Sequence, residues 1–515
     1  MVIAECETLI IGAGASGCVI AARLVERSDA RVTVVEAGPD YGSFAEGLWP
    51  AEILDYRTIP TSHDWDLWNE PRSGGDRFPL PCARVVGGSS SHNACGINWG
   101  SVSDYEEWTA LGNPGWGAAE MLSYLQRVEA DREASGPWHG RTGPVPVTRF
   151  SEDGLVPFFA GVADGARALG VRWLDDVNDP NAAVGIGRTA WNVMKGVRWN
   201  AALAYLDPVR GRPNLRVLAD SKVDRVLMRG TRAYGAAVLT PEGPLEIHAD
   251  RVVISAGAYG SPATLLRSGI GAAQHLRELG VAVVNDLPGV GQHLQDHPVT
   301  PLRFYATAAG MRSARALAAQ GIPPRSQVEI RARSEGARHP CDLHFTFSTG
   351  SAVQDGWEFL IRVEVFKPSS SGSVRLRSAD PGEAPIVDSR YFSDPEGRDL
   401  AAMRDGVRFV RELMSTPAVA EHVARERWPT ERVTKEELDA FAAANAYTYH
   451  HPCGTCKMGP SRDALAVVDA RGRVHGIEGL YVGDASIMPT IPAAMPNLTC
   501  MAIGERLADL LLRGD

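Results

Sequence analysis

A glycine-rich turn between an apolar strand and a helix constrains this chain more than any other feature. Residues 8–26 read TLIIGAGASGCVIAARLVE, in which Gly12, Gly14 and Gly17 form a Gly-x-Gly-x-x-Gly turn. A second apolar stretch, RVTVVEAGPD, carries Glu36 near its end. Strand, glycine turn, helix, strand and a trailing acid are the fingerprint of a dinucleotide-binding unit. We therefore expect an α/β fold that begins with a Rossmann-like unit.

Each part of the fingerprint has a physical reason. Gly12 permits the tight turn, Gly14 lets the backbone approach a pyrophosphate, and Gly17 lets the helix pack on the strand. Free N–H groups at the start of the helix attract phosphates. Glu36 is expected to accept hydrogen bonds from the adenosine ribose. The fingerprint alone does not separate FAD from NAD. The predicted binding residues here are Gly12, Gly14, Ala15, Ser16, Gly17, Glu36 and Ala37.

Length and charge narrow the function classes. The 515 residues suffice for two or three domains, and 44% hydrophobic and 22% charged residues is an ordinary globular composition. A net charge of −10 argues against a nucleic-acid partner. The N-terminal MVIAECETLII lacks a basic region and a cleavage site, and no apolar run reaches the ~18 residues of a spanning helix. We expect a cytoplasmic protein without a membrane partner.

The stretch Tyr447–Gly459, YTYHHPCGTCKMG, combines two adjacent histidines with a CxxC pair. The residues alone allow a metal site, a redox dithiol, or a catalytic base beside inert thiols. A zinc site needs a second pair of ligands at metal spacing, which the sequence does not offer. A redox dithiol needs an exposed helix N-terminus in a thioredoxin-like unit. We predict no metal, and we interpret the 8 cysteines as buried thiols rather than a disulfide framework.

Four further segments carry a family resemblance. They are ARVVGGSSSHNACGINWGSVSDYEEW (83–108), ISAGAYGSPATLLRSGIG (254–271), LPGVGQHLQDHP (287–298) and GLYVGDASIMPTIPAAMPNLTCMAIGERLADLL (479–511). With the N-terminal fingerprint they resemble, in order and from end to end, the glucose–methanol–choline (GMC) flavin oxidoreductases. Within that family the motifs resemble the choline oxidase branch most closely. The resemblance implies FAD as the cofactor and an enzyme that acts on CH–OH donors.

The resemblance also implies two domains. A discontinuous FAD-binding domain would comprise residues 1–150, 200–298 and 445–515, and a substrate-binding domain on a mainly antiparallel sheet would comprise 151–199 and 299–444. The segments GSVRLRSAD and LHFTFSTG alternate like half-buried strands, and residues 400–414 show helical spacing. Residues 71–81 and 321–336, rich in Gly, Pro or Arg, are expected to be the longest segments without regular structure.

The family pattern selects one histidine from the YTYHHPCGTCKMG stretch. The family's catalytic base stands three residues before the glycine of GTC, which here is His451. An imidazole with an ordinary pKa of about 6.5 can accept the hydroxyl proton at neutral pH, while flavin N5 accepts the hydride. Asn497 matches the second catalytic position, where an amide can hold the substrate oxygen without titrating. Cys453 and Cys456 are then packing residues.

Other positions are assigned by the same resemblance. His450 stands where the choline oxidase branch has a tyrosine, and with Tyr449 it is a candidate substrate contact; a structural role for His450 stays open. His92 coincides with the residue that bonds FAD covalently in that branch; simple packing against the flavin is the alternative. The implied flavin contacts beyond the first unit are Arg84, Gly87, Gly88, Ser89, His92, Asn93, Ala94, Val223, Asp484 and Ala485.

The expected activity is FAD-dependent oxidation of an alcohol to a carbonyl compound, with O2 or another acceptor reoxidising the flavin. The histidine at 450 favours a neutral primary alcohol, heteroaromatic (pyridoxine-like), aryl or sugar-like, over a quaternary ammonium. The alternatives are a choline-type oxidase, an FAD-containing hydroxynitrile lyase-like enzyme and a flavin-binding protein without turnover. An NAD enzyme is disfavoured because the resemblance runs through the flavin loop. The acceptor and the oligomeric state stay open, a homo-oligomer included.

Overall fold

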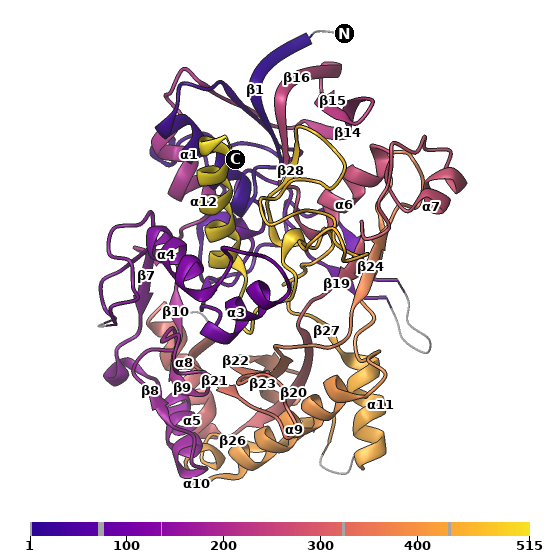
Figure 1. Ribbon diagram of the computed structural model, residues 1–515. Helices are drawn as coiled ribbons and strands as arrows, with labels where there is room; N and C mark the ends of the chain where they lie inside the picture. Colours follow the sequence, from indigo (N-terminus) through magenta and orange to yellow (C-terminus); the bar gives the residue numbers. More distant parts are fainter. Residues whose placement is uncertain (1–2, 71–76, 135, 322–324, 431–433, 515) are drawn as a thin grey trace.

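Two large β-sheets organise the chain, and each is covered by helices (Figure 1). The computed structural model describes residues 3–70, 77–134, 136–321, 325–430 and 434–514. The first sheet has the strand order β13-β2-β1-β16-β15-β14, with β28 paired to β16. Its strands are β1 (Ile3–Ile11), β2 (Val32–Val35), β13 (Leu215–Leu218), β14 (Lys222–Arg229), β15 (Arg232–Thr240), β16 (Gly243–Ile254) and β28 (Leu480–Val482).

The first sheet is parallel where the glycine turn leaves it. β1 pairs in parallel with β2 and β16, and β28 pairs in parallel with β16. Strands of this kind are covered on both faces, which explains why Thr8–Ile11 of β1 and all of β2 are buried. α1 (Ala15–Arg27) packs against the C-terminal α12 (Asn497–Arg513), and Arg23 Nε donates to Glu505 Oε1 at 2.8 Å. The two ends of the chain therefore build one layer (Figure 1).

The second sheet is mainly antiparallel, in the order β26-β20-β23-β22-β21-β9-β8 with β27 paired to β20. Its strands are β8 (Trp173–Leu174), β9 (Gly185–Arg188), β20 (Pro298–Ala306), β21 (Arg325–Ala332), β22 (Leu343–Val353), β23 (Gly356–Val365), β26 (Val423–Trp428) and β27 (Tyr447–Thr448). The helices beside it are α5 (Pro157–Ala168), α8 (Ala308–Ala319), α9 (Arg398–Ser415), α10 (Pro417–Ala420) and α11 (Lys435–Asn445).

The two faces of the second sheet differ in chemistry. One face presents Phe345, Ile361 and Val363, which join apolar residues of α5 and α9 in a single core. Residues paired across antiparallel strands share a face, and Glu329 pairs with Thr346, Thr346 with Arg362, and His344 with Glu364. We call this second set the polar face; it comprises Glu329, His344, Thr346, Arg362 and Glu364.

Shorter elements complete the fold. The remaining helices are α2 (Ala51–Leu54), α3 (Val102–Ala110), α4 (Ala118–Val128), α6 (Gly257–Arg267) and α7 (Ala273–Glu278). Small sheets join β5 (Gly96–Ile97), β10 (Ala190–Trp191), β7 (Val145–Arg149) and β6 (Glu129–Asp131), and β19 (Gln292–Leu294), β24 (Gly372–Arg375) and β25 (Ile386–Asp388). Two-stranded pairs are β3 (Leu67–Trp68) with β4 (Pro79–Leu80), β11 (Val193–Met194) with β12 (Val197–Arg198), and β17 (Ile270–Gly271) with β18 (Asn285–Asp286).

The predicted α/β class, with a parallel first sheet and a mainly antiparallel second sheet, is confirmed. The helix expected at 400–414 is α9, and LHFTFSTG lies in β22. GSVRLRSAD contains β24, which belongs to the small sheet with β19 and β25. The strands of the first sheet all fall within the segments assigned to the FAD-binding domain, whose boundaries stay a prediction.

The expectation of an irregular segment at 321–336 is wrong, because β21 occupies Arg325–Ala332. The strand was not recognised in the sequence because it contains the charged residues Glu329 and Arg331. Tertiary contacts bury both side chains. Residues 322–324 lie outside the described residues. In the segment 71–81, residues 71–76 also lie outside them, and Pro79–Leu80 form β4.

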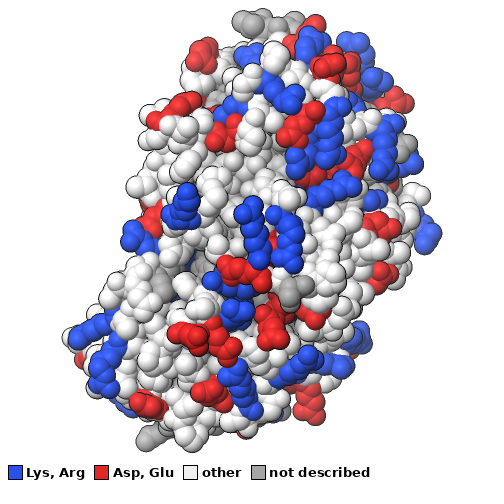
Figure 2. Space-filling view, turned by 90° about the vertical axis from the view of Figure 1, so that its left-hand side faces the viewer, with Lys and Arg blue, Asp and Glu red and all other residues white. Residues whose placement is uncertain are grey.

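The surface carries charges of both signs. Figure 2 shows Lys and Arg intermixed with Asp and Glu over the face in view, as suits an acidic protein without a basic stripe on that face. Among the described helices, none combines the length and the apolar character needed to cross a bilayer.

Candidate functional site

The glycine turn lies where the carboxyl ends of parallel strands meet. Gly12 N donates to Val35 O at 2.8 Å, and Ser255 N donates to Ile11 O at 2.7 Å. Gly483, directly after β28, donates from its N–H to Ile254 O at 2.9 Å. Loops from β1, β2, β16 and β28 are thus brought to one edge of the sheet. This edge is where open α/β sheets bind their ligands.

The three glycines of the turn have different surroundings. Gly12 has a φ of +99°, and a Cβ there would lie 2.5 Å from Ser255 O. A Cβ on Gly17 would lie 2.0 Å from Gly12 O, so α1 approaches the turn as closely as the backbone allows. A Cβ on Gly14 would have Ser255 O, at 3.9 Å, as its nearest atom, so the space on that side of Gly14 at the N-terminus of α1 is open. Gly12 and Gly17 have the surroundings expected for a tight turn and for close packing of the helix, and the approach of Gly14 to a pyrophosphate stays a prediction.

Glu36 lies at the end of β2, beside Ala37. Its Oε2 accepts from Ala13 N and its Oε1 from Gly38 N, both at 2.9 Å. Burial raises the carboxyl pKa to about 7, against the effect of these hydrogen bonds. Each oxygen keeps a lone pair for a further donor. Ser221 N donates to Glu36 O at 2.8 Å, which brings the start of β14, and with it Val223, to the same region.

The predicted flavin loop packs directly on the glycine turn. Gly87 N donates to Ala13 O at 2.7 Å, and a Cβ on Gly88 would lie 2.6 Å from Gly14 Cα. Arg84 and Ser89 on this loop are exposed, whereas Gly87 and Gly88 are buried. Two segments more than sixty positions apart in the sequence therefore form one continuous backbone surface.

Three consecutive residues beyond this loop hold buried polar atoms that find no partner among the described residues. These atoms are Ser91 Oγ, His92 Nε2 and Asn93 Nδ2. Burial lowers the pKa of His92, whose Nδ1 lies 4.0 Å from Asp64 Oδ2. Buried polar groups are normally hydrogen-bonded. Together with the open space on the Cβ side of Gly14, these atoms fit the polar groups and the phosphates of a bound dinucleotide, and Ala94 follows them in the chain.

Asp484 holds the chain around the site. Its Oδ1 accepts from Ser486 N at 2.8 Å, and its Oδ2 accepts from Gly257 N at 2.8 Å and from Ser261 Oγ at 2.6 Å. Its carboxylate is therefore already occupied by the chain's own donors. The next residue, Ala485, accepts through its carbonyl from Gly454 N at 3.1 Å. This contact joins the glycine-turn region to the histidine stretch.

His451 is half-buried and lies between Asp296 and His297 on one side and Tyr449 on the other. Its backbone N–H donates to Asp296 Oδ1 at 2.9 Å, and its Nδ1 lies 2.9 Å from His297 Nδ1. The Tyr449 ring meets the imidazole edge to face at 4.7 Å. Burial lowers the pKa of His451 well below its usual value, and the neighbouring histidines, His297 first, lower it further. The imidazole is therefore neutral at neutral pH.

The partners of His297 assign the tautomer of His451. His297 Nε2 lies 3.2 Å from Pro492 O, which can only accept, so this nitrogen carries the hydrogen. Burial lowers the pKa of His297 to about 3, so the ring is neutral and its Nδ1 is an acceptor. His451 Nδ1–H then donates to it, which leaves the lone pair of His451 on Nε2. Phe366 stacks on His297 at 4.4 Å and holds this ring in place.

In the loop at residues 491–493, just before Asn497, every backbone N–H and carbonyl group makes a hydrogen bond. The carbonyls of Ile491, Pro492 and Ala493 accept from Lys367, His297 and Arg331. Gln295 and Asp104 accept from the N–H groups of Ile491 and Ala493. Asn497 begins α12 from this anchored loop, and its buried Nδ2 has no partner among the described residues. It is a donor available to a bound molecule.

His450 faces an interior surface. Its φ of 66° is unusual for a residue other than glycine, and such conformations cluster at functional sites. The side chain is exposed, yet surrounding protein desolvates it and lowers its pKa to about 4, with Arg362 contributing. Tyr449 and Arg362 are half-buried and strongly desolvated in the same way. We call His450, Tyr449, His451 and Arg362 the inner surface.

The two cysteines of the CxxC pair are fully buried. The backbone N–H of Cys453 donates to Gln295 O at 2.8 Å, and the backbone N–H of Gln295 donates to Cys453 O at 3.1 Å. Burial raises the pKa of the Cys453 and Cys456 thiols well above the usual value. A reactive thiolate needs the opposite shift.

A separate cluster joins Glu129, Asp131 and His139 closely enough to suggest a metal site. Both ring nitrogens of His139 face carboxylates, Nδ1 to Glu129 at 2.6 Å and Nε2 to Asp176 at 2.7 Å. Burial alone would lower the pKa of His139, but these hydrogen bonds raise it to about 9. Arg149 pairs with Asp131 at 2.5 Å. The cluster is therefore a buried ion network around an imidazolium.

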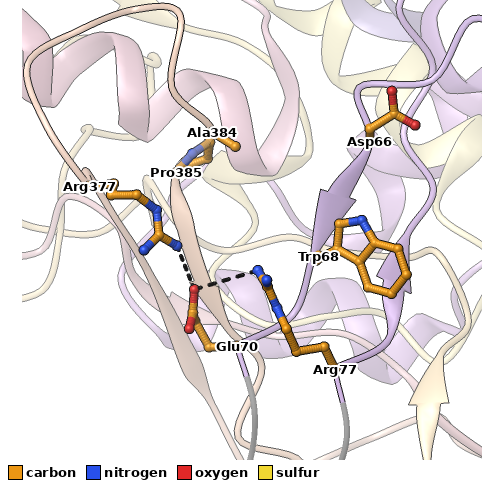
Figure 3. A pocket seen from close by; sticks show the side chains of 7 residues that line it. All are labelled: Asp66, Trp68, Glu70, Arg77, Arg377, Ala384 and Pro385. Atoms are coloured by element: carbon orange, nitrogen blue, oxygen red, sulfur yellow. Dashed lines mark hydrogen bonds and ion pairs between the residues drawn. The ribbon is translucent and has the colours of Figure 1, made fainter.

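A pocket with a volume of about 310 Å³ is drawn in Figure 3. Its lining includes none of the predicted site residues. Glu70 pairs with Arg377 at 2.6 Å and with Arg77 at 3.9 Å. The charges of these three lining residues therefore largely neutralise one another. The lining residues are Asp66, Trp68, Glu70, Arg77, Arg377, Ala384 and Pro385.

Sequence reasoning missed His297, Arg362 and the anchored loop as parts of the site. His297 stands in the LPGVGQHLQDHP segment, which carried the resemblance, but nothing in it indicates contact with a histidine 154 positions later. Arg362 lies in WEFLIRVEVFK (357–367), a segment expected from the sequence to line the pocket, but the sequence singled out no residue of it. The sequence does not reveal which strands of the second sheet pair with one another, and this pairing is what brings Arg362 to the site.

Comparison with known proteins adds a family match. Sequence profiles described as GMC oxidoreductase match residues 6–299 and 368–504. Mitochondrial choline dehydrogenase of Mus musculus is 35% identical over 542 residues, covering 98% of this chain and 89% of the relative. Choline oxidase of Arthrobacter globiformis is 33% identical over 529 residues, covering 98% and 94%. The crystal structure of pyridoxine 4-oxidase from Mesorbium loti superposes with a TM-score of 0.89 at 30% identity, covering 99% of each chain.

Proposed function

The chain belongs to the GMC oxidoreductase family, and from this premise we propose that it oxidises a neutral primary alcohol with His451 as the base. It is an FAD-dependent oxidoreductase that acts on CH–OH donors. An alcohol substrate and O2 or another electron acceptor are typical of the family. The family resemblance predicted from the sequence is thereby confirmed.

The observation that carries the proposal is the assigned tautomer of His451. Its Nε2 lone pair is free to take the hydroxyl proton of an alcohol, and its Nδ1–H is held by His297. Asn497 Nδ2 supplies a donor for the substrate oxygen. FAD, when bound, accepts the hydride that leaves the alcohol carbon. The chain's own contribution is therefore to orient the alcohol and to remove its proton.

The substrate proposed is heteroaromatic (pyridoxine-like), aryl or sugar-like. The half-buried aromatic ring of Tyr449 beside His451 suits a flat or ring-shaped molecule. Similarity to pyridoxine 4-oxidase over 99% of both chains supports the heteroaromatic form. Choline-type oxidation is the alternative that the choline dehydrogenases among the relatives support.

The test is anaerobic reduction of the purified yellow protein by a panel of alcohols, followed by admission of air. We expect one class of neutral alcohol to bleach the flavin absorbance. Rapid recolouring with formation of peroxide would identify an oxidase, and slow recolouring would identify a dehydrogenase with another acceptor. If no alcohol bleaches the flavin while a cyanohydrin is cleaved, the hydroxynitrile lyase-like alternative replaces this proposal.

We also propose that FAD is covalently attached through His92 Nε2 to the 8α-carbon of the flavin. The nitrogen is buried, has no partner among the described residues, and belongs to a ring that burial keeps neutral. Forming the bond removes one hydrogen from the flavin methyl group and one from the imidazole. The two electrons released pass to O2 or another acceptor.

His92→Ala tests this attachment. After acid denaturation and filtration, the yellow colour is expected to stay with the wild-type chain and to pass the filter with the variant, which should keep part of its activity. A matched control is His275→Gln in α7, away from the site, where the flavin should stay attached. Release of flavin from the denatured wild-type chain would refute covalent attachment.

A further inference from the structure

Arg362 lies one strand away from the segment that carries the base, with β20 between them. On β23 it pairs with Pro301 of β20, and Glu364, two residues along, pairs with Val299. Val299 also pairs with Tyr447 of β27, the strand that leads into Tyr449, His450 and His451. The polar face of the second sheet and the histidine stretch are therefore joined at this point. The electrostatic coupling of Arg362 to His450 and Tyr449 agrees with this placement.

The acids near Arg362 are already engaged by other groups. Glu364 accepts from His344 Nδ1 at 3.0 Å and from Thr346 Oγ1 at 2.7 Å. Glu329 accepts from Asn98 Nδ2 at 3.1 Å and lies 3.7 Å from His344 Nε2. Burial alone would lower the pKa of His344, but Glu364 and Glu329 raise it to about 9, so an imidazolium already neutralises one carboxylate charge.

The charge of Arg362 is consequently not balanced by an ion pair within the described part of the chain. Burial acts to lower the pKa of Arg362, but the nearby Tyr447 and Tyr449, and then Glu364, raise it overall; the side chain is half-buried on the inner surface. His450 is neutral, since its pKa is lowered to about 4 chiefly by burial. Arg362 thus places a guanidinium without an ion-pair partner among the described residues on the inner surface, and it offers N–H donors to whatever binds there.

We propose that Arg362 is the specificity-determining residue of the substrate site: it donates to an acceptor atom of an uncharged alcohol and excludes cationic alcohols. Two positive charges in a desolvated site repel strongly, whereas a guanidinium bonds readily to a ring nitrogen or an oxygen. This inference rests on the proposed alcohol oxidation and names the charge class of its substrate.

The test compares two matched probes, pyridin-3-ylmethanol and its N-methylpyridinium cation, in the FAD-loaded enzyme. The wild type should reduce its flavin with the neutral probe and far more slowly with the cation. Arg362→Gln should lower kcat/KM for the neutral probe by about 10- to 100-fold, the usual loss for a hydrogen bond to a charged group. Arg362→Glu should reverse the preference, and Arg362→Lys should keep the exclusion of the cation.

Arg303→Gln is the control, because Arg303 lies on the same side of the sheet but pairs with Glu358. It should behave as the wild type toward both probes. Flavin content and the visible spectrum of each variant show whether it folds. If wild type and Arg362→Glu prefer the same probe, the inference fails while alcohol oxidation stands. If neither these probes nor any alcohol of the panel bleaches the wild-type flavin, the proposed function itself fails.

Discussion

His451→Gln is expected to lower the rate of flavin reduction by an alcohol by about 10²- to 10⁴-fold, the usual contribution of a general base. Glutamine fills a similar volume and can still donate to His297, but it cannot accept the hydroxyl proton through a basic nitrogen. The FAD content should not change, because His451 is held by Asp296 and His297 rather than by the glycine turn. Anaerobic stopped-flow spectroscopy of flavin bleaching measures this rate.

The pH dependence of the rate of flavin reduction is an independent test of His451 as the base. The pKa of His451 is lowered well below its usual value, chiefly by burial, and the active form is the neutral one. Activity should therefore persist below the ordinary imidazole pKa of about 6.5 before it falls. His275→Gln should leave both rate and profile unchanged. Normal bleaching by His451→Gln would show that another group takes the proton.

Gly17→Ala is expected to prevent stable folding of the first unit and to abolish FAD binding. The added Cβ would lie 2.0 Å from Gly12 O, a backbone atom that cannot move without displacing the turn. Overpacking in a core costs about 1–3 kcal/mol, and more where backbone must shift. The measurement is the thermal unfolding midpoint, with the flavin absorbance per protein as the second readout.

Gly14→Ala is the matched comparison, because it makes the same residue change in the same motif but in different surroundings. Its φ of −78° suits alanine, and the nearest atom to the new Cβ would be Ser255 O at 3.9 Å. The flavin-free chain should therefore unfold near the wild-type temperature, while FAD affinity falls because the methyl group occupies the space for the pyrophosphate. Equal stability of both variants would contradict the assigned roles of the two glycines.

The sequence by itself determined the first unit of the fold and its ligand class. Strand, turn and helix are local structures, and the spacing of Gly12, Gly14 and Gly17 already contains the steric reason for each glycine. The order of the family motifs along the chain likewise indicated FAD, alcohol oxidation and the choice of His451 over His450. These inferences need no knowledge of which distant segments meet.

Only the tertiary structure decided what surrounds the base. The contact between His297 and His451 spans 154 positions, and that between His297 and Pro492 spans 195. Strand register across the second sheet placed Arg362 one strand away from the histidine stretch. It also buried the charged side of β21, whose sequence had suggested an irregular segment. Tautomer, pKa and charge balance depend on distances through space, so a linear pattern of residues cannot determine them.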